Sequence, residues 1–124
     1  MATMIKFRAW DKVQKVMMVP RDMQTDSDGN IFYVEARSLD GEYDEGDLDV
    51  FELEQFTGLT DVNGKDIYEG DILENRKYRS IVKFARGKFL ADVVGVISRF
   101  DLIGEIHGSK VIGNVHANPE LLKG

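Results

Sequence analysis

The sequence predicts an all-β fold, mainly antiparallel and organised as a small barrel, and three observations support this prediction. Apolar and polar residues alternate along most segments, which is the period of a strand with one buried face. Glycine, asparagine and aspartate separate these segments at short intervals, as the turns of a meander do. The length of 124 residues, of which 43% are hydrophobic, suits a single domain over residues 1–124 with one core.

The chain is expected to begin with a hairpin. Residues 5–9 alternate between apolar and charged side chains, which predicts a strand with one buried face. Residues 10–15 then turn the chain into a second strand, 16–20, which Pro20 is expected to end because proline has no N–H to donate. Trp10 is predicted near the end of the first strand, packed partly against the core.

The next segments alternate between strands and turns. Residues 27–30, SDGN, form a turn that leads into a strand over 31–36. If Glu35 faces water, that strand buries the three residues of the opposite face, Phe32, Val34 and Ala36. Residues 38–49 are acidic and lack an apolar face, so they are interpreted as a loop. Residues 50–56 alternate again and are predicted as a strand, with a helix as the alternative.

The segment TGLTDVNGKDIYEGDIL, residues 57–73, contains two turn signals. The Asn63-Gly64 pair is a strong hairpin signal, and both residues tolerate the positive φ of a type I′ turn. Gly70 allows a sharp entry into the next strand, where the Asp71 carboxylate accepts backbone N–H groups. These features indicate turns and give only a weak signal for a ligand loop.

The remainder of the chain is predicted as a meander with a short helical end. The expected strands and turns follow in the order 71–75, turn 76–79, 80–85, turn 86–88 and 89–97. Residues 98–109 fit either a short helical turn or a bent strand. Residues 110–117 form the last strand, with Gly113 as a bulge. Asn118 as N-cap and Pro119 at the first helical position then begin one helical turn.

The charges divide along the chain. Residues 26–74 hold 16 acids and two bases, whereas residues 75–124 hold nine bases and four acids. The extremes are Asp40–Glu54, with eight acids and no base, and Arg76–Lys88, with six bases and no acid. Both regions are interpreted as solvated faces, or as surfaces that contact each other within the fold or between subunits.

Three blocks of the sequence carry a family resemblance. MIKFRAWD at the start, QFTGLTDVNGKDIYEGDIL in the middle and VIGNVHANPELL at the end resemble the signature blocks of the YopX family of small bacteriophage and prophage proteins. The blocks occur in family order and span nearly the whole chain. The resemblance implies an all-β, SH3-like barrel core and a phage or prophage origin. The N-terminal hairpin extension and the short C-terminal helical turn expected above would be added to this core. The resemblance implies no particular reaction.

No catalytic, cofactor or metal site is predicted. The chain has no cysteine, and no nucleophile, Walker or dinucleotide motif occurs in it. His107 and His116 alone make a poor metal set, and the acidic run has glycine at the wrong place for a calcium loop. No signal peptide is expected, because residues 1–10 have no apolar stretch of signal-peptide length, and the longest apolar runs, such as 93–97, are too short to span a membrane. The expected location is the cytoplasm of a bacterial host cell.

Two binding functions remain. The first is a non-enzymatic protein-interaction or self-associating module, either a homo-oligomer or one bound to a phage or host protein, because sheet edges invite pairing and opposite charges orient neighbours. The second is nucleic-acid binding by the basic hairpin 76–88, with Phe84 in the core. Its predicted contact residues are Arg76, Lys77, Tyr78, Arg79, Arg86 and Lys88. The acidic total, a net charge of −6, opposes this alternative.

Overall fold

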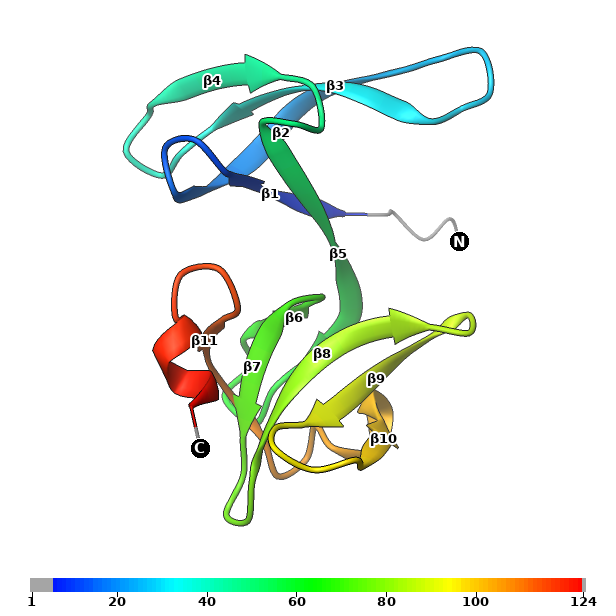
Figure 1. Ribbon diagram of the computed structural model, residues 1–124, viewed down its shortest axis with the longest axis vertical. Helices are drawn as coiled ribbons and strands as arrows, with labels where there is room; N and C mark the ends of the chain where they lie inside the picture. Colours follow the sequence, from blue (N-terminus) through cyan, green and yellow to red (C-terminus); the bar gives the residue numbers. More distant parts are fainter. Residues whose placement is uncertain (1–5, 124) are drawn as a thin grey trace. The chain divides into compact units, whose positions relative to one another are not determined.

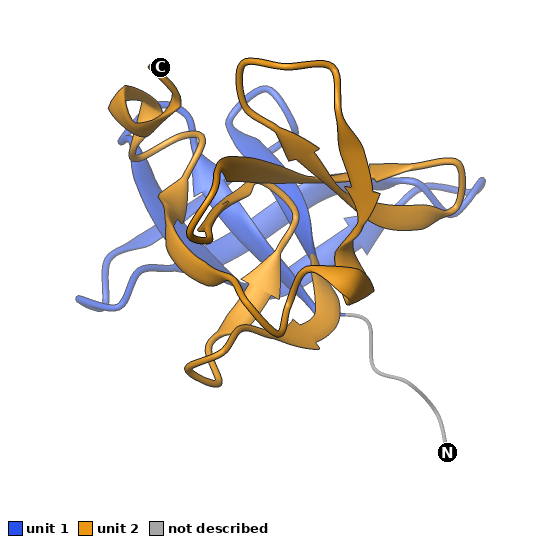
Figure 2. Ribbon diagram, turned by 90° about the horizontal axis from the view of Figure 1, so that it is seen from below, with its two compact units in different colours: residues 1–55 blue, residues 56–124 orange. Residues whose placement is uncertain are grey.

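The structure, a computed structural model, describes residues 6–123 and confirms a mainly antiparallel all-β fold (Figure 1). The chain divides into two compact units, residues 1–55 and residues 56–124 (Figure 2). Strand β5 (Phe51–Thr60) runs through this boundary and contributes to both units.

The first unit is an antiparallel sheet in the order β4-β3-β2-β1-β5. Its other strands are β1 (Phe7–Asp11), β2 (Val16–Thr25), β3 (Ile31–Arg37) and β4 (Tyr43–Gly46). One face of the sheet buries an apolar cluster formed by Ala9, Met18, Val34, Ala36 and Phe51. Burial of these side chains is the main stabilising contribution within this unit.

The N-terminal hairpin is confirmed, since β1 pairs with β2 and Trp10 is buried one residue before β1 ends. Ile5 lies outside the described residues. The prediction that Pro20 ends the second strand is wrong, because β2 continues to Thr25. The pairing of β1 with β2 stops at Met18, and the register between β2 and β3 shifts just after Pro20. Proline is tolerated here because it lies at a bulge, beyond the pairing with β1.

Two other predictions for this unit need correction. Phe32 is half-exposed, although Val34 and Ala36 are buried as expected. Residues 38–49 are not entirely a loop, because they contain β4, which pairs with β3. This strand has no apolar face to reveal it in the sequence. Polar contacts hold it instead: Tyr33 and Tyr43 both donate hydrogen bonds to Glu45, and the Arg37 guanidinium lies 5.6 Å from the centre of the Tyr43 ring.

The second unit contains a five-stranded antiparallel sheet in the order β10-β9-β8-β7-β11. Its strands are β7 (Asp71–Glu74), β8 (Arg79–Ala85), β9 (Lys88–Val93), β10 (Arg99–Asp101) and β11 (Lys110–Asn114). In addition, β6 (Asp66–Tyr68) pairs with the second half of β5. Strand β5 itself confirms the strand predicted over 50–56 and extends it to Thr60. A second apolar cluster is formed by Ile67, Leu73, Val82, Ala91 and Leu102.

The two clusters show that the expectation of one core is wrong, because each unit buries its own set of apolar side chains. The assignment of residues 1–124 to a single domain stays a prediction. The SH3-like barrel is not confirmed either, since within residues 6–123 neither sheet closes on itself. Short strands and short turns predicted the antiparallel meander, but they did not determine whether its edges meet.

The predicted turns are present, but one has a different geometry. Gly64 has a φ of +79°, whereas Asn63 has no positive φ, so the Asn63-Gly64 turn is not type I′. The two-residue turn between β8 and β9 has that signature instead, with φ of +55° at Arg86 and +79° at Gly87. Gly70 has a φ of +89°, which confirms the conformation predicted for it.

The C-terminal third combines both alternatives considered for residues 98–109. A short strand, β10, is followed by a 3₁₀ turn, η1 (Leu102–Gly104). The strand predicted over 89–97 ends at Val93. The register shift in β11 confirms the bulge at Gly113. The helical end is a 3₁₀ turn, η2 (Pro119–Leu122), in which the Asn118 side chain accepts the N–H of Asn114 rather than capping η2 (3.2 Å).

Candidate binding surfaces

Strand β8 separates the predicted basic residues into two groups. Arg76 and Lys77 lie in the turn between β7 and β8, whereas Arg86 and Lys88 lie at the turn between β8 and β9, at the other end of the strand (Figure 1). A strand of seven residues spans about 20 Å at roughly 3.3 Å per residue. The basic segment 76–88 therefore forms two separate surfaces rather than one.

Two of the predicted contact residues already have acidic partners. Arg79 Nε lies 3.0 Å from Glu74 Oε2, and its Nη1 donates to the Leu121 carbonyl (3.0 Å). Lys88 Nζ lies 2.8 Å from Asp101 Oδ1. Both pairs are formed within the second unit and are partly exposed, so each adds little stability but lowers the local positive charge.

The β7–β8 turn presents its bases differently. The Asn75 side-chain oxygen accepts the backbone N–H groups of Lys77 (2.8 Å) and Tyr78 (3.0 Å), and this fixes the turn. Arg76 and Lys77 follow at its exposed tip. Neither side chain forms an ion pair or a hydrogen bond within residues 6–123. These two charges are available to an anionic ligand.

Tyr78 is held in place beside this turn. Its ring stacks on Phe100, with the centroids 5.9 Å apart and the planes inclined by 17°, and its hydroxyl donates to Glu105. The hydrogen bond to Glu105, burial and the charge of Glu105 raise the pKa of Tyr78, so the hydroxyl stays protonated at neutral pH. The stacked pair is partly exposed, with 43% of Phe100 accessible to solvent.

A cleft of about 290 Å³ adjoins the same turn. Its lining residues are Val62, Glu74, Asn75, Arg76, Gly108 and Lys110. Lys110, like Arg76, has no ion-pair partner among the described residues, whereas Glu74 is neutralised by Arg79. A second cleft, of about 390 Å³, shares Val62 and includes Asp61 and His107.

Asp61 organises the loop between these clefts. Its Oδ1 accepts the N–H groups of Asn63 (2.8 Å) and Lys65 (2.9 Å), and its Oδ2 accepts that of Val111 (2.8 Å). Burial raises the pKa of Asp61, but the backbone donors of Val111, Lys65 and Asn63 outweigh burial and lower it overall. The carboxylate is therefore ionised and fully partnered, so it does not act as a free anion beside the cleft.

An apolar groove of about 190 Å³ lies at the other end of β8. It is lined by Leu59, Lys88, Phe89, Asp101, Leu102 and Ile103. Phe89 packs edge-on against Phe84, with the ring centroids 4.9 Å apart. The prediction that Phe84 belongs to the core is wrong, because it is 50% exposed and lies beyond the end of the buried cluster.

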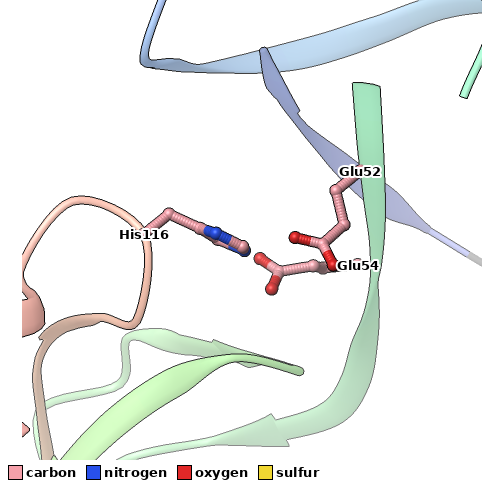
Figure 3. A group of neighbouring side chains, drawn as sticks. All are labelled: Glu52, Glu54 and His116. Atoms are coloured by element: carbon pink, nitrogen blue, oxygen red, sulfur yellow. The ribbon is translucent and has the colours of Figure 1, made fainter. Parts of the chain in front are cut away.

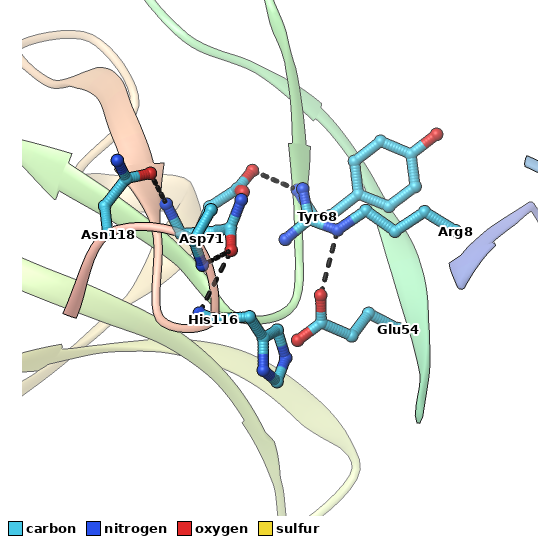
Figure 4. Close-up of polar contacts among 8 residues, drawn as sticks. Arg8, Glu54, Tyr68, Asp71, His116 and Asn118 are labelled. Atoms are coloured by element: carbon cyan, nitrogen blue, oxygen red, sulfur yellow. Dashed lines mark hydrogen bonds and ion pairs between the residues drawn. The ribbon is translucent and has the colours of Figure 1, made fainter. Parts of the chain in front are cut away.

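Two acidic residues of strand β5, Glu52 and Glu54, lie beside strand β1. Glu52 and Glu54 lie two positions apart on β5 and project to the same side of it (Figure 3). Arg8, on the adjacent strand β1, forms an ion pair with Glu54. The distance from Arg8 Nε to Glu54 Oε1 is 2.9 Å (Figure 4). This ion pair is largely buried and links the two strands.

Asp11 and Asp44 form an unusual pair of carboxyl groups in the first unit. Asp11 is fully buried, and its Oδ1 accepts the N–H groups of Val13 and Gln14, both at 2.9 Å. Burial raises the pKa of Asp11, but hydrogen bonds from Asp44 and the backbone lower it overall. The bond to Asp11 raises the pKa of Asp44. Asp11 Oδ2 is itself buried and has no hydrogen-bond partner of acceptable geometry within residues 6–123.

The loop after β11 is built from side-chain contacts to the backbone (Figure 4). Asn114 Oδ1 accepts the N–H groups of His116 (3.0 Å) and Ala117 (2.9 Å). The Asp71 carboxylate accepts the Tyr68 N–H (2.8 Å), as the sequence predicted for the turn entering β7. His116 thus belongs to this loop, whereas His107 lines the cleft beside Asp61.

The fold and these surfaces define an all-β protein with two units and with clefts on the second unit. Residues 6–123 match the family described as YopX protein, so the chain belongs to the YopX family. The chain is also similar to protein EF1440 from Enterococcus faecalis, for which a crystal structure exists. The two are 26% identical over 98% of this chain and 100% of that one, with a TM-score of 0.68. No curated protein matches the chain.

The family match extends over both units, which confirms the resemblance seen in the three sequence blocks. Among the described residues, no helix is both long and apolar enough to cross a membrane.

Proposed function

We propose that this YopX-family chain is a non-enzymatic interaction module of phage or prophage origin that self-associates in the cytoplasm of a bacterial host. The single observation that carries this proposal is an apolar groove on the second unit together with a fully exposed leucine on the first. Leu39 is 95% exposed, and the groove is lined by Leu59, Phe89, Leu102 and Ile103. We assign Leu39 of a second copy as the occupant of the groove.

The loop that carries Leu39 is ordered. Ser38 donates its N–H to Glu42 (2.8 Å) and accepts the Gly41 N–H (3.1 Å), while its side-chain oxygen accepts the Glu42 N–H (3.0 Å). An apolar side chain held at the tip of such a turn loses little conformational entropy on binding. A groove of about 190 Å³ is large enough for one aliphatic side chain.

Charge favours the same contact. Residues 1–55 contain 13 acids and six bases, whereas residues 56–124 contain nine acids and ten bases. The Leu39 loop carries Asp40 and Glu42, and at the groove Lys88 is paired with Asp101. An acidic loop meets less repulsion on such a nearly neutral surface than on another acidic one. Because the two patches differ, the contact is heterologous and joins copies head to tail.

Sedimentation and light scattering over a range of protein concentrations test this proposal. Leu39→Ser and Ile103→Ser should each reduce self-association, and higher salt should weaken it in the wild type. Val13→Ser is the matched control, since Val13 is 71% exposed on the turn between β1 and β2. A wild type that is monomeric at every concentration would contradict self-association and would leave the groove to a different phage or host protein.

The nucleic-acid alternative is favoured by a separate observation, the unpaired bases of the β7–β8 turn, and concerns the other end of β8. It retains Arg76, Lys77 and Tyr78 as contact residues. Arg79 and Lys88 are less suitable, because each already has an acidic partner.

A further inference from the structure

We infer that the cleft at the β7–β8 turn binds a phosphate group of a single-stranded nucleic acid, and that the Tyr78–Phe100 stack contacts a neighbouring base. This site lies at the opposite end of β8 from the apolar groove and is independent of self-association. It includes three residues that the sequence did not indicate, namely Asn75, Phe100 and Lys110.

The charges around the cleft favour an anion. Arg76 and Lys110 both line it and have no ion-pair partner within residues 6–123, and Lys77 follows Arg76 at the exposed tip of the turn. Exposed bases that do not have to break an existing ion pair can release counterions when they contact phosphates.

The acids near the cleft are already partnered. Glu74 pairs with Arg79 at 3.0 Å, and Glu105 accepts the Tyr78 hydroxyl hydrogen bond. Asp61, on the adjoining cleft, accepts three backbone N–H groups. A phosphate in the cleft therefore meets two unpaired cations, Arg76 and Lys110. Each of the three nearby carboxylates already has a hydrogen-bond or ion-pair partner.

The cleft and the aromatic stack are linked through neighbouring residues. Tyr78 immediately follows the turn residues Arg76 and Lys77, and its hydroxyl is bound to Glu105. The backbone carbonyl of Glu105 accepts the N–H of Gly108, which lines the cleft (3.4 Å). The partly exposed Phe100 ring lies parallel to Tyr78 and offers a flat apolar surface. Bases can reach such a surface only when they are unstacked, as in a single strand.

The acidic total does not exclude this site, because the acids concentrate elsewhere in the chain. Residues 1–55 have a formal net charge of −7, whereas residues 56–124, which carry the cleft, have a net charge of +1. Interactions between exposed charges fall off over about 8 to 10 Å at physiological salt, so the nearest charges dominate at the cleft.

The test measures the affinity of the full chain for fluorescein-labelled oligo(dT) and oligo(U) by anisotropy at several salt concentrations. Arg76→Gln combined with Lys110→Gln should weaken binding to both probes and reduce the slope of log affinity against log salt by about 0.7 for each phosphate that the variant no longer neutralises. Lys83→Gln combined with Arg86→Gln is the matched control, because neither residue lines the cleft or the apolar groove. It removes the same net charge at the other end of β8 and should retain nearly wild-type affinity.

Two further variants separate the charge from the stack. Arg76→Lys combined with Lys110→Arg should preserve most of the binding, since it preserves both charges. Phe100→Ala should weaken binding about fivefold to a hundredfold and leave the salt slope unchanged. The inference is overturned if the wild type does not bind either oligonucleotide at low salt, if the two glutamine pairs reduce affinity equally, or if a duplex of equal length binds more tightly.

Discussion

The two ends of strand β8 carry equal numbers of turn bases but present different surfaces. Each end carries two bases in a turn, Arg76 and Lys77 at one and Arg86 and Lys88 at the other. At the first end both bases are unpaired and Arg76 lines a cleft. At the second end Lys88 pairs with Asp101 at the edge of an apolar groove, and only Arg86 is left without an ion-pair partner within residues 6–123. Turns with equal numbers of bases thus differ in how many of those bases are available to an anion.

The apolar cluster of the second unit supports both ends of strand β8. Leu73 is 1% exposed in the cluster of the second unit, so Leu73→Ala should lower the free energy of unfolding by about 2–5 kcal/mol. Oligonucleotide binding and self-association should weaken together in this variant. Chemical denaturation measures the loss of stability. Phe84→Ala is the control, because the half-exposed Phe84 side chain should cost much less stability when truncated. Equal losses for the two variants would contradict the assigned core.

A change at Asp61 should affect only the cleft end. In Asp61→Asn, one side-chain oxygen becomes an NH₂ group and can no longer accept either the Val111 N–H or the pair from Asn63 and Lys65. The expected cost is about 1–3 kcal/mol, with weaker oligonucleotide binding and unchanged self-association.

The same residue gives a pH dependence of known sign. The pKa of Asp61 lies below its usual value of 3.8 in the folded state, so its ionised form contributes stability above about pH 4. This contribution is lost as the pH falls through the lowered pKa. The difference in unfolding free energy between the wild type and Asp61→Asn should therefore shrink on acidification. A difference that stays constant from pH 7 to pH 2.5 would show that the ionised Asp61 carboxylate does not contribute to stability.

A change at Gly70 should lower stability and leave both surfaces intact. Gly70 has a φ of +89°, its N–H donates to the Val82 carbonyl (2.8 Å), and its carbonyl accepts the Val115 N–H (2.9 Å). Gly70→Ala should cost roughly 1–2 kcal/mol, because a Cβ disfavours this conformation. Gly70→Asn should cost less, since asparagine tolerates positive φ better. Thermal melts check both values, and an unchanged melting temperature for Gly70→Ala would refute the assignment.

Much of the fold was predictable because strands with one apolar face alternate clearly. The hairpin of β1 and β2, the strand 31–36, Gly70 with Asp71, and the bulge at Gly113 all follow from local chemistry. Strand β4 was missed because tyrosine, arginine and glutamate contacts hold it in place of an apolar face. The division into two cores depends on long-range packing, which alternation does not specify.

The candidate site was predictable only in part. The basic run indicated Arg76, Lys77 and Tyr78, but the same run included Arg79, whose ion pair with Glu74 becomes apparent only from strand pairing. Lys110 is far from this run in the sequence and enters the site because β11 pairs with β7. The proximity of Phe100 to Tyr78 likewise depends on the folded sheet, and no sequence signal marked it.

The most direct test of the difference between the two ends is a titration of the ¹⁵N-labelled chain with oligo(dT), followed by NMR chemical-shift changes at low and moderate salt. The account predicts changes at residues 75–78, at Phe100 and at residues 105–110, which decrease as salt increases. It predicts no comparable changes at Arg86, Gly87 or Lys88. Larger changes at the β8–β9 turn than at the β7–β8 turn, or no changes at all, would contradict it.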